Sequence, residues 1–481
     1  MVAAYPESTY NQIFPADMSR AKTSTESRLV EYGHDTSFPL ITKRALKNFS
    51  ELLKGFPLVW RVAVMLYGFR PFNPANFEYK KLSSTLGDNF LNGDTYEIVF
   101  DAQCLQTDSL NRGIGRYSLK FIEAICRAQP GKSFAALLTN IASPTDLSSA
   151  QLALESLKCS NLDVAILDPF KGRMKLSLAD AQQNLLSDLE KIKFRCLIAL
   201  SSFQKPESVV ALDLPKNVKH KRVAIFYDLI PLQYPKHLLI SKWQKTLYRW
   251  TLNNLANFDL LLAISNESRQ HWLNLVSSET SIEVIHGGID LKNTNLQKKF
   301  EQRSGVLCVG AEQPHKNVAL LIDAYSHLPT DLQLEHDLII VGIKSFAVRK
   351  RLIKIARAAI GNVEITRYLD ESALSAVYEN ARLLVMPSLV EGLSLPILEA
   401  WSSGLLAIGG VNTVAEELIA DHSLLFDPTS APSMAKCMNR LLNSQVDWNR
   451  GLESSMLRSK EFTWGATAEL ALEAIGAIGH D

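Results

Sequence analysis

Short apolar runs alternate with longer amphipathic stretches from residue 96 onward. Short buried runs, each followed by a polar loop and by helical spacing, indicate parallel strands covered by helices on both faces. In the first half of this region the predicted strands are Tyr96–Phe100, Ala135–Leu138, Val164–Leu167, Cys196–Leu200 and Val223–Phe226. In the second half they are Val306–Val309, Leu338–Val341, Val363–Ile365, Leu383–Met386, Ala407–Ile408 and Ser423–Phe426. The pattern predicts an α/β protein with two doubly wound domains in succession.

This pattern divides the chain into four parts. They are an N-terminal extension (1–94), a first doubly wound domain (95–295), a second one (296–460) and a C-terminal segment (461–481). The two domains are expected to join near residues 290–304. The stretch Ala466–Ile478 has helical spacing and no strand after it, so we expect a last helix that crosses back to the first domain.

The longest apolar stretch of the extension is Phe56–Phe69, which Arg61 interrupts. It is too short for a membrane span, because a span needs roughly 18 apolar residues. We favour a buried helix packed on the main body of the protein. The alternative is an interfacial helix, because aromatic residues lie within the stretch and four basic residues precede it, namely Lys43, Arg44, Lys47 and Lys54. This alternative implies a peripheral membrane contact.

Composition narrows the class of protein. Of the 481 residues, 47% are hydrophobic and 21% are charged, which excludes disorder over most of the chain. The formal net charge is only +1, so the chain lacks the basic excess typical of a duplex nucleic-acid binder, and we expect no nucleic-acid partner. The sequence has no C-x-x-C pair and no continuous apolar run at its start, so we expect a cytoplasmic protein.

The segment Leu383–Ala400 carries the strongest chemical signal. It reads LLVMPSLVEGLSLPILEA, a strand followed by a loop and a helix with Pro396 in its first turn. Ligands of open α/β sheets bind beyond the carboxyl ends of the strands. Ser394 is a candidate N-cap residue, and the free N–H groups of Gly392–Leu395 suit a phosphate or a sugar hydroxyl.

Two carboxylates flank this helix start. Glu391 lies in the loop, where it can hydrogen-bond sugar hydroxyls and stabilise positive charge that develops at an anomeric carbon. Glu399 lies about one turn into the helix, where it can bridge the two hydroxyls of a ribose. The structural alternative is that Glu391 complements the helix dipole and that Glu399 is solvated.

The string Glu391–Ala400 resembles the E-x7-E signature of the retaining, nucleotide-sugar-dependent glycosyltransferases of family 4, usually written E-G-F-G-L-P-x-L-E-A. The resemblance extends over most of residues 96–460 and includes a subgroup of mannosyltransferases of surface-polysaccharide assembly. It implies the GT-B fold, in which two Rossmann-like domains face each other across a cleft. The nucleotide sugar then lies mainly on the second domain, and the acceptor lies on the first.

The resemblance also implies roles for residues of the second domain. Val309–Asn317 reads VGAEQPHKN and resembles the family's V-G-x-x-x-P-R-K-N, in which the lysine faces the donor diphosphate. Glu391 and Lys316 are therefore the catalytic candidates, with a solvated loop lysine as the alternative for Lys316. The implied donor-binding residues are Gly310, His315, Lys316, Gly392, Leu393, Ser394, Leu395, Glu399 and Glu416.

The first domain carries an implied loop for the acceptor or the diphosphate. Asp101–Gln106 and Arg112–Tyr117 resemble the strings D-A-Q-x-L-Q and R-G-I-G-R-Y of one subgroup. Gly113 and Gly115 are expected to let the backbone approach a diphosphate or an acceptor closely. Arg116 is either a phosphate clamp or a helix-surface residue.

Three positions depart from the family pattern. Tyr227 stands where many relatives have a histidine that contacts the donor sugar, and Asp228 beside it either faces the acceptor or caps a turn. His315 replaces an arginine, which weakens one diphosphate contact or makes it pH-dependent. Arg367 replaces a glycine in the segment that binds the nucleotide base. These departures keep two alternatives open, a catalytically weak or inactive nucleotide-sugar-binding relative and a sugar-nucleotide epimerase.

The resemblance implies transfer of a hexosyl group from a nucleotide sugar to a glycan or lipid-linked acceptor in polysaccharide biosynthesis, with retention of configuration. Mannose from GDP-mannose is the first candidate, and UDP-glucose and UDP-N-acetylglucosamine remain open. No D-x-D motif and no cluster with metal-ligand spacing stands near the implied diphosphate site, so we expect neither a metal nor another cofactor. The protein is expected in the cytoplasm, and at the inner membrane face if the interfacial alternative holds.

Overall fold

The computed structural model describes residues 78–80, 95–173, 175–203, 220–276, 278–290, 298–310 and 312–478. Contacts within the chain divide it into residues 1–67 and 68–481, and every described residue belongs to the second part. The stretch Phe56–Phe69 lies outside the described residues, so both of its alternatives stay predictions.

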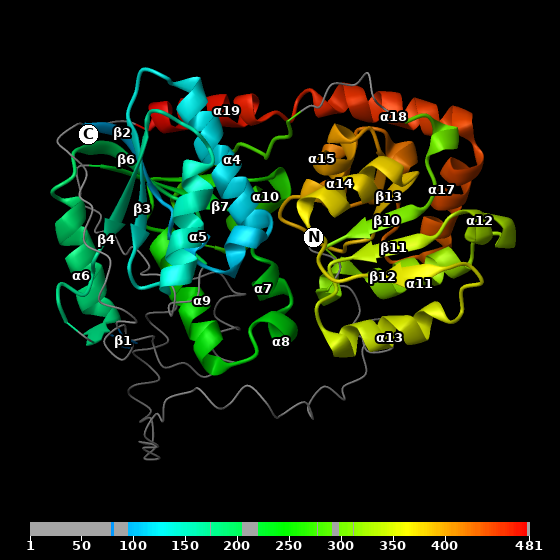
Figure 1. Ribbon diagram of the computed structural model, residues 1–481, viewed down its shortest axis with the longest axis horizontal. Helices are drawn as coiled ribbons and strands as arrows, with labels where there is room; N and C mark the ends of the chain where they lie inside the picture. Colours follow the sequence, from blue (N-terminus) through cyan, green and yellow to red (C-terminus); the bar gives the residue numbers. More distant parts are fainter. Residues whose placement is uncertain are drawn as a thin grey trace, which may run out of the picture. The chain divides into compact units, whose positions relative to one another are not determined.

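Within the described residues, the first sheet contains seven parallel strands in the order β4-β3-β2-β6-β7-β8-β9 (Figure 1). Its strands are β2 (Tyr96–Asp101), β3 (Phe134–Thr139), β4 (Leu162–Leu167), β6 (Phe194–Ala199), β7 (Lys221–Phe226), β8 (Leu260–Ala263) and β9 (Ser281–Val284). The helices of this part are α4 (Gly113–Ala128), α5 (Pro144–Glu155), α6 (Leu178–Leu189), α7 (Ile230–Gln233), α8 (Pro235–Leu238), α9 (Lys242–Leu255) and α10 (Asn266–Leu275). The five strands predicted for this half are confirmed.

The second sheet, in the part of the chain that the structure describes, has six parallel strands in the order β12-β11-β10-β13-β14-β15. They are β10 (Val306–Val309), β11 (Leu338–Val341), β12 (Val363–Ile365), β13 (Leu383–Met386), β14 (Leu406–Gly410) and β15 (Leu425–Phe426). The helices that accompany them are α11 (Val318–Ser326), α12 (Thr330–Glu335), α13 (Phe346–Ala356), α14 (Glu371–Asn380), α15 (Leu395–Ser402), α16 (Val414–Leu418), α17 (Ala431–Asn443) and α18 (Gln445–Ser459). The six predicted strands of this half are confirmed, and the doubly wound α/β class with them.

The order of each sheet reverses at one point. In the second sheet the chain moves outward from β10 to β12 and then returns to β13, which pairs with the other side of β10. The first sheet reverses in the same way between β2 and β6. Loops that leave neighbouring strands in opposite directions open a crevice at such a point, and ligands of doubly wound sheets bind there.

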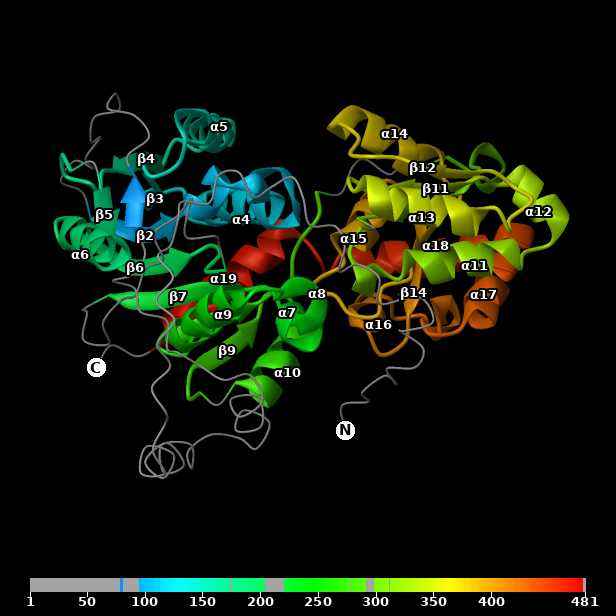
Figure 2. The ribbon, with the colours of Figure 1, turned by 90° about the horizontal axis from the view of Figure 1, so that it is seen from below.

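The last helix, α19 (Trp464–Ala477), packs on the first domain. Ala468 and Ala471 of α19 belong to the same hydrophobic cluster as Phe121 and Ile125 of α4. Figures 1 and 2 show α19, in red, beside α4 and the first sheet, whereas α18 runs along the second sheet's helices. The chain therefore returns to the first domain after completing the second one.

Four of the described strands are not predicted from the sequence. β8 is a buried run of four apolar residues like the predicted strands, so its signal was present and missed, whereas β9 is an edge strand that exposes alternate residues and has no continuous apolar run. Part of the predicted N-terminal extension is also a strand. β1 (Glu78–Lys80) pairs antiparallel with β5 (Lys175–Ser177) and so connects the extension to the first domain.

Candidate functional site

The candidate site lies where the second sheet reverses its order. The chain after β10 turns at Gly310 and enters the short 3-10 helix Pro314–Lys316. The chain after β13 forms the loop that carries Glu391. The two loops bring the predicted catalytic residues together, since Nζ of Lys316 lies 3.1 Å from Oε1 of Glu391. Gly310 has a φ of 76°, and a Cβ there would meet no atom within 4 Å, so its turn leaves open space.

Glu391 is the buried half of an ion pair whose lysine, Lys316, remains partly exposed. The residue is only 4% exposed, and its Oε1 accepts a hydrogen bond from the Ser388 hydroxyl in addition to the Lys316 contact. A buried carboxylate needs such partners, because taking an unpaired charge out of water costs several kcal/mol. The pair therefore holds a negative and a positive group at fixed positions beyond the carboxyl ends of β10 and β13.

The start of α15 lies next to this pair and carries an unpartnered hydroxyl. Leu395 begins the helix and Pro396 lies in its first turn, as predicted. Ser394 stands at the N-cap position, but the prediction that it caps the helix is wrong, because its ψ of 77° departs from the extended backbone of capping serines and its side chain makes no capping bond. Its Oγ is buried and, among the described residues, has no hydrogen-bond partner. Leaving a hydroxyl unpaired costs about 1–3 kcal/mol, which an oxygen of a ligand would recover.

Glu399 is held by a residue of each domain. Oε1 lies 2.6 Å from Nη1 of Arg116, which belongs to α4 of the first domain. Oε2 accepts a hydrogen bond of 2.7 Å from the Tyr378 hydroxyl of α14. Arg116 is a partly exposed residue of α4 that bridges to the carboxylate predicted to hold the ribose, and its role as a phosphate clamp stays a prediction.

His315 is buried and uncharged at neutral pH. The residue is 6% exposed, and burial, assisted by the neighbouring charge of Lys316, lowers its pKa to about 3. The prediction of a pH-dependent diphosphate contact is thereby corrected, because the imidazole stays neutral over the range in which a free histidine titrates. Its Nδ1 is buried without a hydrogen-bond partner in the described part of the chain.

Tyr227 and Asp228 follow β7 and lie on the first-domain side of the site. The Tyr227 hydroxyl lies 3.2 Å from the Ser118 hydroxyl, and its ring contacts Tyr117 edge-on at 5.6 Å. Tyr227 thus points toward α4, which differs from the sugar contact of the family histidine. Asp228 caps the following turn, since its Oδ1 accepts a hydrogen bond of 2.9 Å from the Ile230 amide. Burial raises the pKa of Asp228, and the nearby Lys316 charge partly offsets this.

The two glycines of the α4 start have different surroundings. A Cβ on Gly115 would overlap the carbonyl oxygens of Ser109 and Leu110, so this glycine makes room for its own chain. A Cβ on Gly113 would lie 3.5 Å from Cδ1 of Leu395, which is an ordinary contact. The prediction that both glycines admit a diphosphate or an acceptor is corrected for Gly115, because the adjacent space is already filled by backbone.

The loop between Glu391 and α15 touches the first domain closely. A Cβ on Gly392 would lie 2.7 Å from the carbonyl oxygen of Tyr227, so only glycine fits there. The carbonyl oxygen of Gly392 accepts a hydrogen bond of 3.2 Å from the Ser268 hydroxyl of α10. Leu393 packs against the hydrophobic cluster of the first domain. These contacts place the candidate site between the two domains.

Glu267 lies beside the cluster and was not singled out from the sequence. Burial, with the charge of Glu391 as the next contribution, raises its pKa to about 8. Its Oε2 is buried and has no hydrogen-bond partner in the described residues. An acidic residue in the first turn of a helix such as α10 usually complements the helix dipole, so the sequence gives no signal of this environment.

Glu417 carries an interdomain contact that was not predicted. Its Oε1 accepts a hydrogen bond of 2.8 Å from the Asn266 amide and lies 2.6 Å from Nε2 of His286. Its neighbour Glu416, the predicted donor-site residue, instead accepts a hydrogen bond of 2.6 Å from the Asn412 amide of its own loop. Glu417 therefore links α16 to the first domain, whereas Glu416 shapes the loop before α16.

Comparison with known proteins identifies the second half of the chain. Residues 292–455 match the model of the family described as "Glycosyl transferases group 1". The chain therefore contains a glycosyltransferase group 1 domain, and this domain includes both Lys316 and Glu391.

The similar curated proteins include several bacterial mannosyltransferases. The chain is 25% identical over 409 residues to the "Serotype-specific mannosyltransferase WbdA" of Escherichia coli, which covers 78% of this chain and 47% of that protein. It is 25% identical over 215 residues to the "O-antigen chain mannosyltransferase RfbU" of Salmonella typhimurium, covering 45% of this chain and 59% of the relative. The chain thus spans about half the length of these two curated relatives.

The fold resembles solved glycosyltransferase structures. Sucrose-phosphate synthase of Thermosynechococcus elongatus superposes with a TM-score of 0.58 at 16% identity, covering 79% of this chain and 98% of that one. HepE of Anabaena, crystallised with UDP and glucose, superposes with a TM-score of 0.57 at 16% identity, covering 80% and 100%. At this sequence identity the comparison establishes the fold only. That fold is GT-B, so the predicted architecture is confirmed.

Proposed function

We propose that this protein is a glycosyltransferase that moves a hexosyl group from a nucleotide sugar to a glycan or lipid-linked acceptor with retention of configuration. The observation that carries the proposal is the ion pair between Lys316 and the buried Glu391 beyond β10 and β13, beside the start of α15. The group 1 domain and the mannosyltransferase relatives support the reaction class. Mannose from GDP-mannose is the first candidate, and UDP-sugars stay in the test because HepE was crystallised with UDP and glucose.

The donor diphosphate is proposed to lie between Lys316 and the start of α15. Lys316 supplies a positive charge, and the loop that enters α15 supplies the Gly392, Leu393 and Ser394 amides together with the unpartnered Ser394 hydroxyl, since the Leu395 amide is already bonded to the Leu393 carbonyl oxygen. We propose that these groups stabilise the diphosphate without a metal ion. In the described residues no group of three or more His, Cys, Asp or Glu side chains is placed to hold a metal ion, and the expectation of a metal-free enzyme remains a prediction.

The sugar and the ribose are proposed to contact the two glutamates. Glu391 accepts hydrogen bonds from sugar hydroxyls and stabilises positive charge at the anomeric carbon. Glu399 accepts hydrogen bonds from the ribose hydroxyls. To do so, its Oε1 must either leave Arg116 or accept from Arg116 and the ribose at the same time. The neutral His315 contributes a hydrogen-bonding nitrogen but no charge. Lys316 is therefore the one cation at the two positions where the family pattern has an arginine and a lysine facing the diphosphate.

The proposed transfer is a displacement on one face of the sugar. The bond from the anomeric carbon to the diphosphate oxygen breaks, and the acceptor oxygen forms a bond to the same carbon from the same side. The acceptor hydroxyl gives its proton to the departing diphosphate. Lys316 and the helix N–H groups stabilise the charge that develops on that leaving group, and such preorganised groups are the largest source of rate acceleration in many enzymes.

A transfer and hydrolysis assay with GDP-mannose, UDP-glucose and UDP-N-acetylglucosamine tests the proposal. Turnover of one donor should fall at least about a hundredfold in Lys316→Ala and Glu391→Gln. Lys436→Ala, an exposed lysine of α17, is the matched control and should keep full turnover. Donor binding without turnover, across glycan and lipid-linked acceptors, would instead identify an inactive relative. Interconversion of the donor sugar without an acceptor would identify an epimerase.

A further inference from the structure

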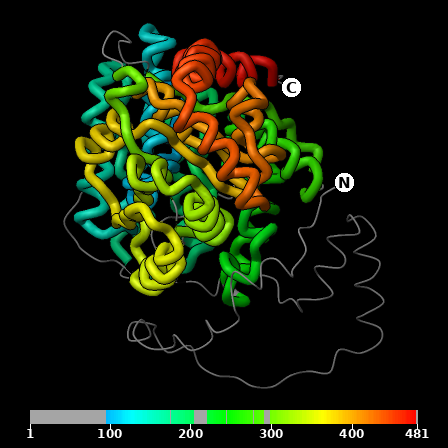
Figure 3. The backbone as a smooth tube through the Cα atoms, turned by 90° about the vertical axis from the view of Figure 1, so that its right-hand side faces the viewer, coloured from blue at the N-terminus to red at the C-terminus, as the bar shows by residue number. Residues whose placement is uncertain are grey.

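One face of the second domain is strongly basic although the whole chain is nearly neutral. The net charge of the chain is +1, yet the segment from Lys344 to Arg367 contains seven lysines and arginines and a single acidic residue, Glu364. This segment contains helix α13 and the edge strand β12. Figures 1 and 3 show α13 at the lower margin of its domain, so its outer face is directed away from the second sheet.

The outer face of α13 mixes cations with large apolar side chains. Leu352 is buried against the domain, whereas residues spaced at i, i+4, i+7, i+8 and i+11 share the opposite, exposed face. Phe346 is 75% exposed and Ile353 is 46% exposed, so two large apolar side chains lie on this face among the cations. The exposed stripe consists of Phe346, Lys350, Ile353, Lys354 and Arg357.

Two more exposed apolar residues follow α13, one within this segment and one directly after it. Ile360 is 62% exposed and Tyr368 is 53% exposed. The ammonium of Lys344 lies 4.3 Å from the centre of the Tyr368 ring, so a cation and an aromatic side chain meet beside the start of α13. The neighbourhood of α13 therefore contains further exposed apolar side chains beside its cations.

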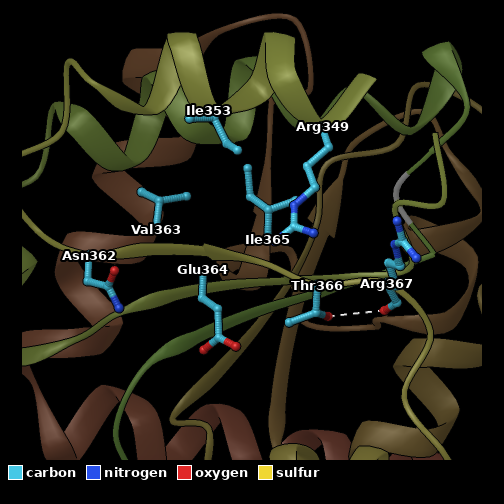
Figure 4. Close-up of a pocket in the computed structure, with 8 residues that line it drawn as sticks. All are labelled: Arg349, Ile353, Asn362, Val363, Glu364, Ile365, Thr366 and Arg367. Atoms are coloured by element: carbon cyan, nitrogen blue, oxygen red, sulfur yellow. Dashed lines mark hydrogen bonds between the residues drawn. The ribbon is translucent and has the colours of Figure 1, made fainter. Parts of the chain in front are cut away.

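A groove runs between α13 and β12 (Figure 4). It has a volume of about 490 Å³, with Ile353 and Val363 among its apolar lining residues. Figure 4 shows Arg349 and Arg367 toward one end and Asn362 toward the other, with the single acid, Glu364, on the strand between them. Two guanidinium groups at one end of a partly apolar groove suit a phosphate attached to an apolar body.

We propose that this face of α13 and β12 docks on an anionic lipid bilayer, with a lipid phosphate between Arg349 and Arg367. A helix that presents lysines and arginines together with a phenylalanine and an isoleucine matches the composition of interfacial helices. Each lysine or arginine near an anionic surface adds to the attraction, and an aromatic side chain anchors at the headgroup level. With eleven residues, α13 is too short to span a bilayer, so the proposed contact lies in the plane of the membrane surface. None of the described helices is long and apolar enough to cross a membrane. The proposal does not depend on which sugar is transferred.

Flotation of the full-length protein with lipid vesicles tests this face. The protein should bind vesicles that contain phosphatidylglycerol and should bind pure phosphatidylcholine vesicles at least about tenfold more weakly. The variant Lys350→Glu/Lys354→Glu/Arg357→Glu and the variant Phe346→Ser/Ile353→Ser should each lose at least about tenfold in binding. The matched control Lys436→Glu/Arg450→Glu/Lys460→Glu makes the same charge change on the exposed surface of α17, α18 and the residue after it, and should bind as the parent does.

Three outcomes would overturn the proposal. Unchanged binding by both α13 variants would assign the vesicle contact to another part of the chain, such as the basic residues before Phe56. Binding that millimolar inorganic phosphate abolishes would assign the groove to a free anion. Tight binding to RNA but not to vesicles would assign the face to a nucleic acid. Thermal unfolding of each variant, compared with the parent, separates a binding defect from a folding defect, and the transfer assay reports independently on the proposed function.

Discussion

Arg116 and Glu399 form an ion pair that joins α4 of the first domain to α15 of the second, with Nη1 and Oε1 2.6 Å apart. The second oxygen of Glu399 is engaged by Tyr378, so neither oxygen is free in this structure. The proposed ribose contact therefore requires Glu399 to exchange or share a partner. Because both charged groups are partly solvated, the exchange is inexpensive.

Removing this ion pair is expected to change donor binding more than stability. Side-chain exposures of 49% for Arg116 and 25% for Glu399 limit its contribution to less than about 1 kcal/mol, so Arg116→Ala should barely change the urea midpoint. The donor KM should stay the same or fall in Arg116→Ala and should rise in Glu399→Gln. Steady-state kinetics with both variants checks this, and a large rise of KM in Arg116→Ala would assign Arg116 to the donor instead.

Breaking the Lys316–Glu391 pair is expected to cost stability as well as activity. Lys316→Met leaves Glu391 as an unpaired charge at a position that is 4% exposed, and such a loss typically costs about 3–5 kcal/mol. The double variant Lys316→Met/Glu391→Gln removes both charges and should recover most of that loss while remaining inactive. Urea unfolding and donor turnover measure the two effects. A double variant as unstable as Lys316→Met would contradict the pairing.

Glu267→Gln is expected to stabilise the protein at alkaline pH. Burial raises the pKa of Glu267 to about 8 from an ordinary value of 4.5, so the folded state holds a proton that the unfolded state has lost between these values. Stability then falls as the pH rises through this window, by at most about 1.4 kcal/mol per pH unit. Glutamine mimics the protonated carboxyl group, so the variant's advantage should grow from pH 5 to pH 8. Unfolding curves at each pH check this, and an advantage that is constant with pH would contradict the raised pKa.

The sequence predicts the framework of the site better than its contacts. Parallel strands buried on both faces leave continuous apolar runs, which is why β10, β11, β12 and β13 are found to the residue. The order of the strands is not predicted and comes from the structure. Lys316 and Glu391, far apart in the chain, are predicted as one site through the resemblance of their segments to the glycosyltransferase motifs.

What the sequence does not predict depends on packing between the domains. Glu417 looks like a surface residue until the structure places it against the start of α10 and His286. The neutral state of His315 follows from its burial, which no local pattern encodes. Ser394 has the right residue type for an N-cap, but the backbone around it follows the contacts of Gly392 and Leu393 with the first domain.

The two glycines of the α4 start are expected to differ in their tolerance of alanine. In Gly115→Ala the new methyl group would overlap two backbone carbonyl oxygens, which cannot move without breaking the turn before α4, so we expect a loss of several kcal/mol. In Gly113→Ala the methyl group would make an ordinary contact with Leu395, and stability should change by less than about 1 kcal/mol. Thermal unfolding of the two variants checks this difference. Equal melting temperatures would show that the backbone at Gly115 adapts.

The buried imidazole of His315 is expected to make the protein sensitive to acid. Burial, followed by the charge of Lys316, lowers the pKa of His315 from the ordinary 6.5 to about 3, so between these values the unfolded state binds a proton that the folded state excludes. Stability therefore falls as the pH drops below 6.5, by at most about 1.4 kcal/mol per pH unit.

Replacing His315 with glutamine should remove this part of the acid sensitivity. A smaller slope remains, because burial also lowers the pKa of His336, to about 4. Urea unfolding between pH 4 and pH 7 measures the slope, with His422→Gln, at an exposed position, as the control that should leave it unchanged. Because His315 is neutral over this range, the dependence of kcat/KM on pH between pH 5 and pH 8 should have the same shape in the parent protein and in His315→Gln. A limb near pH 6.5 that is lost in this variant would show that His315 does bind a proton at the working pH.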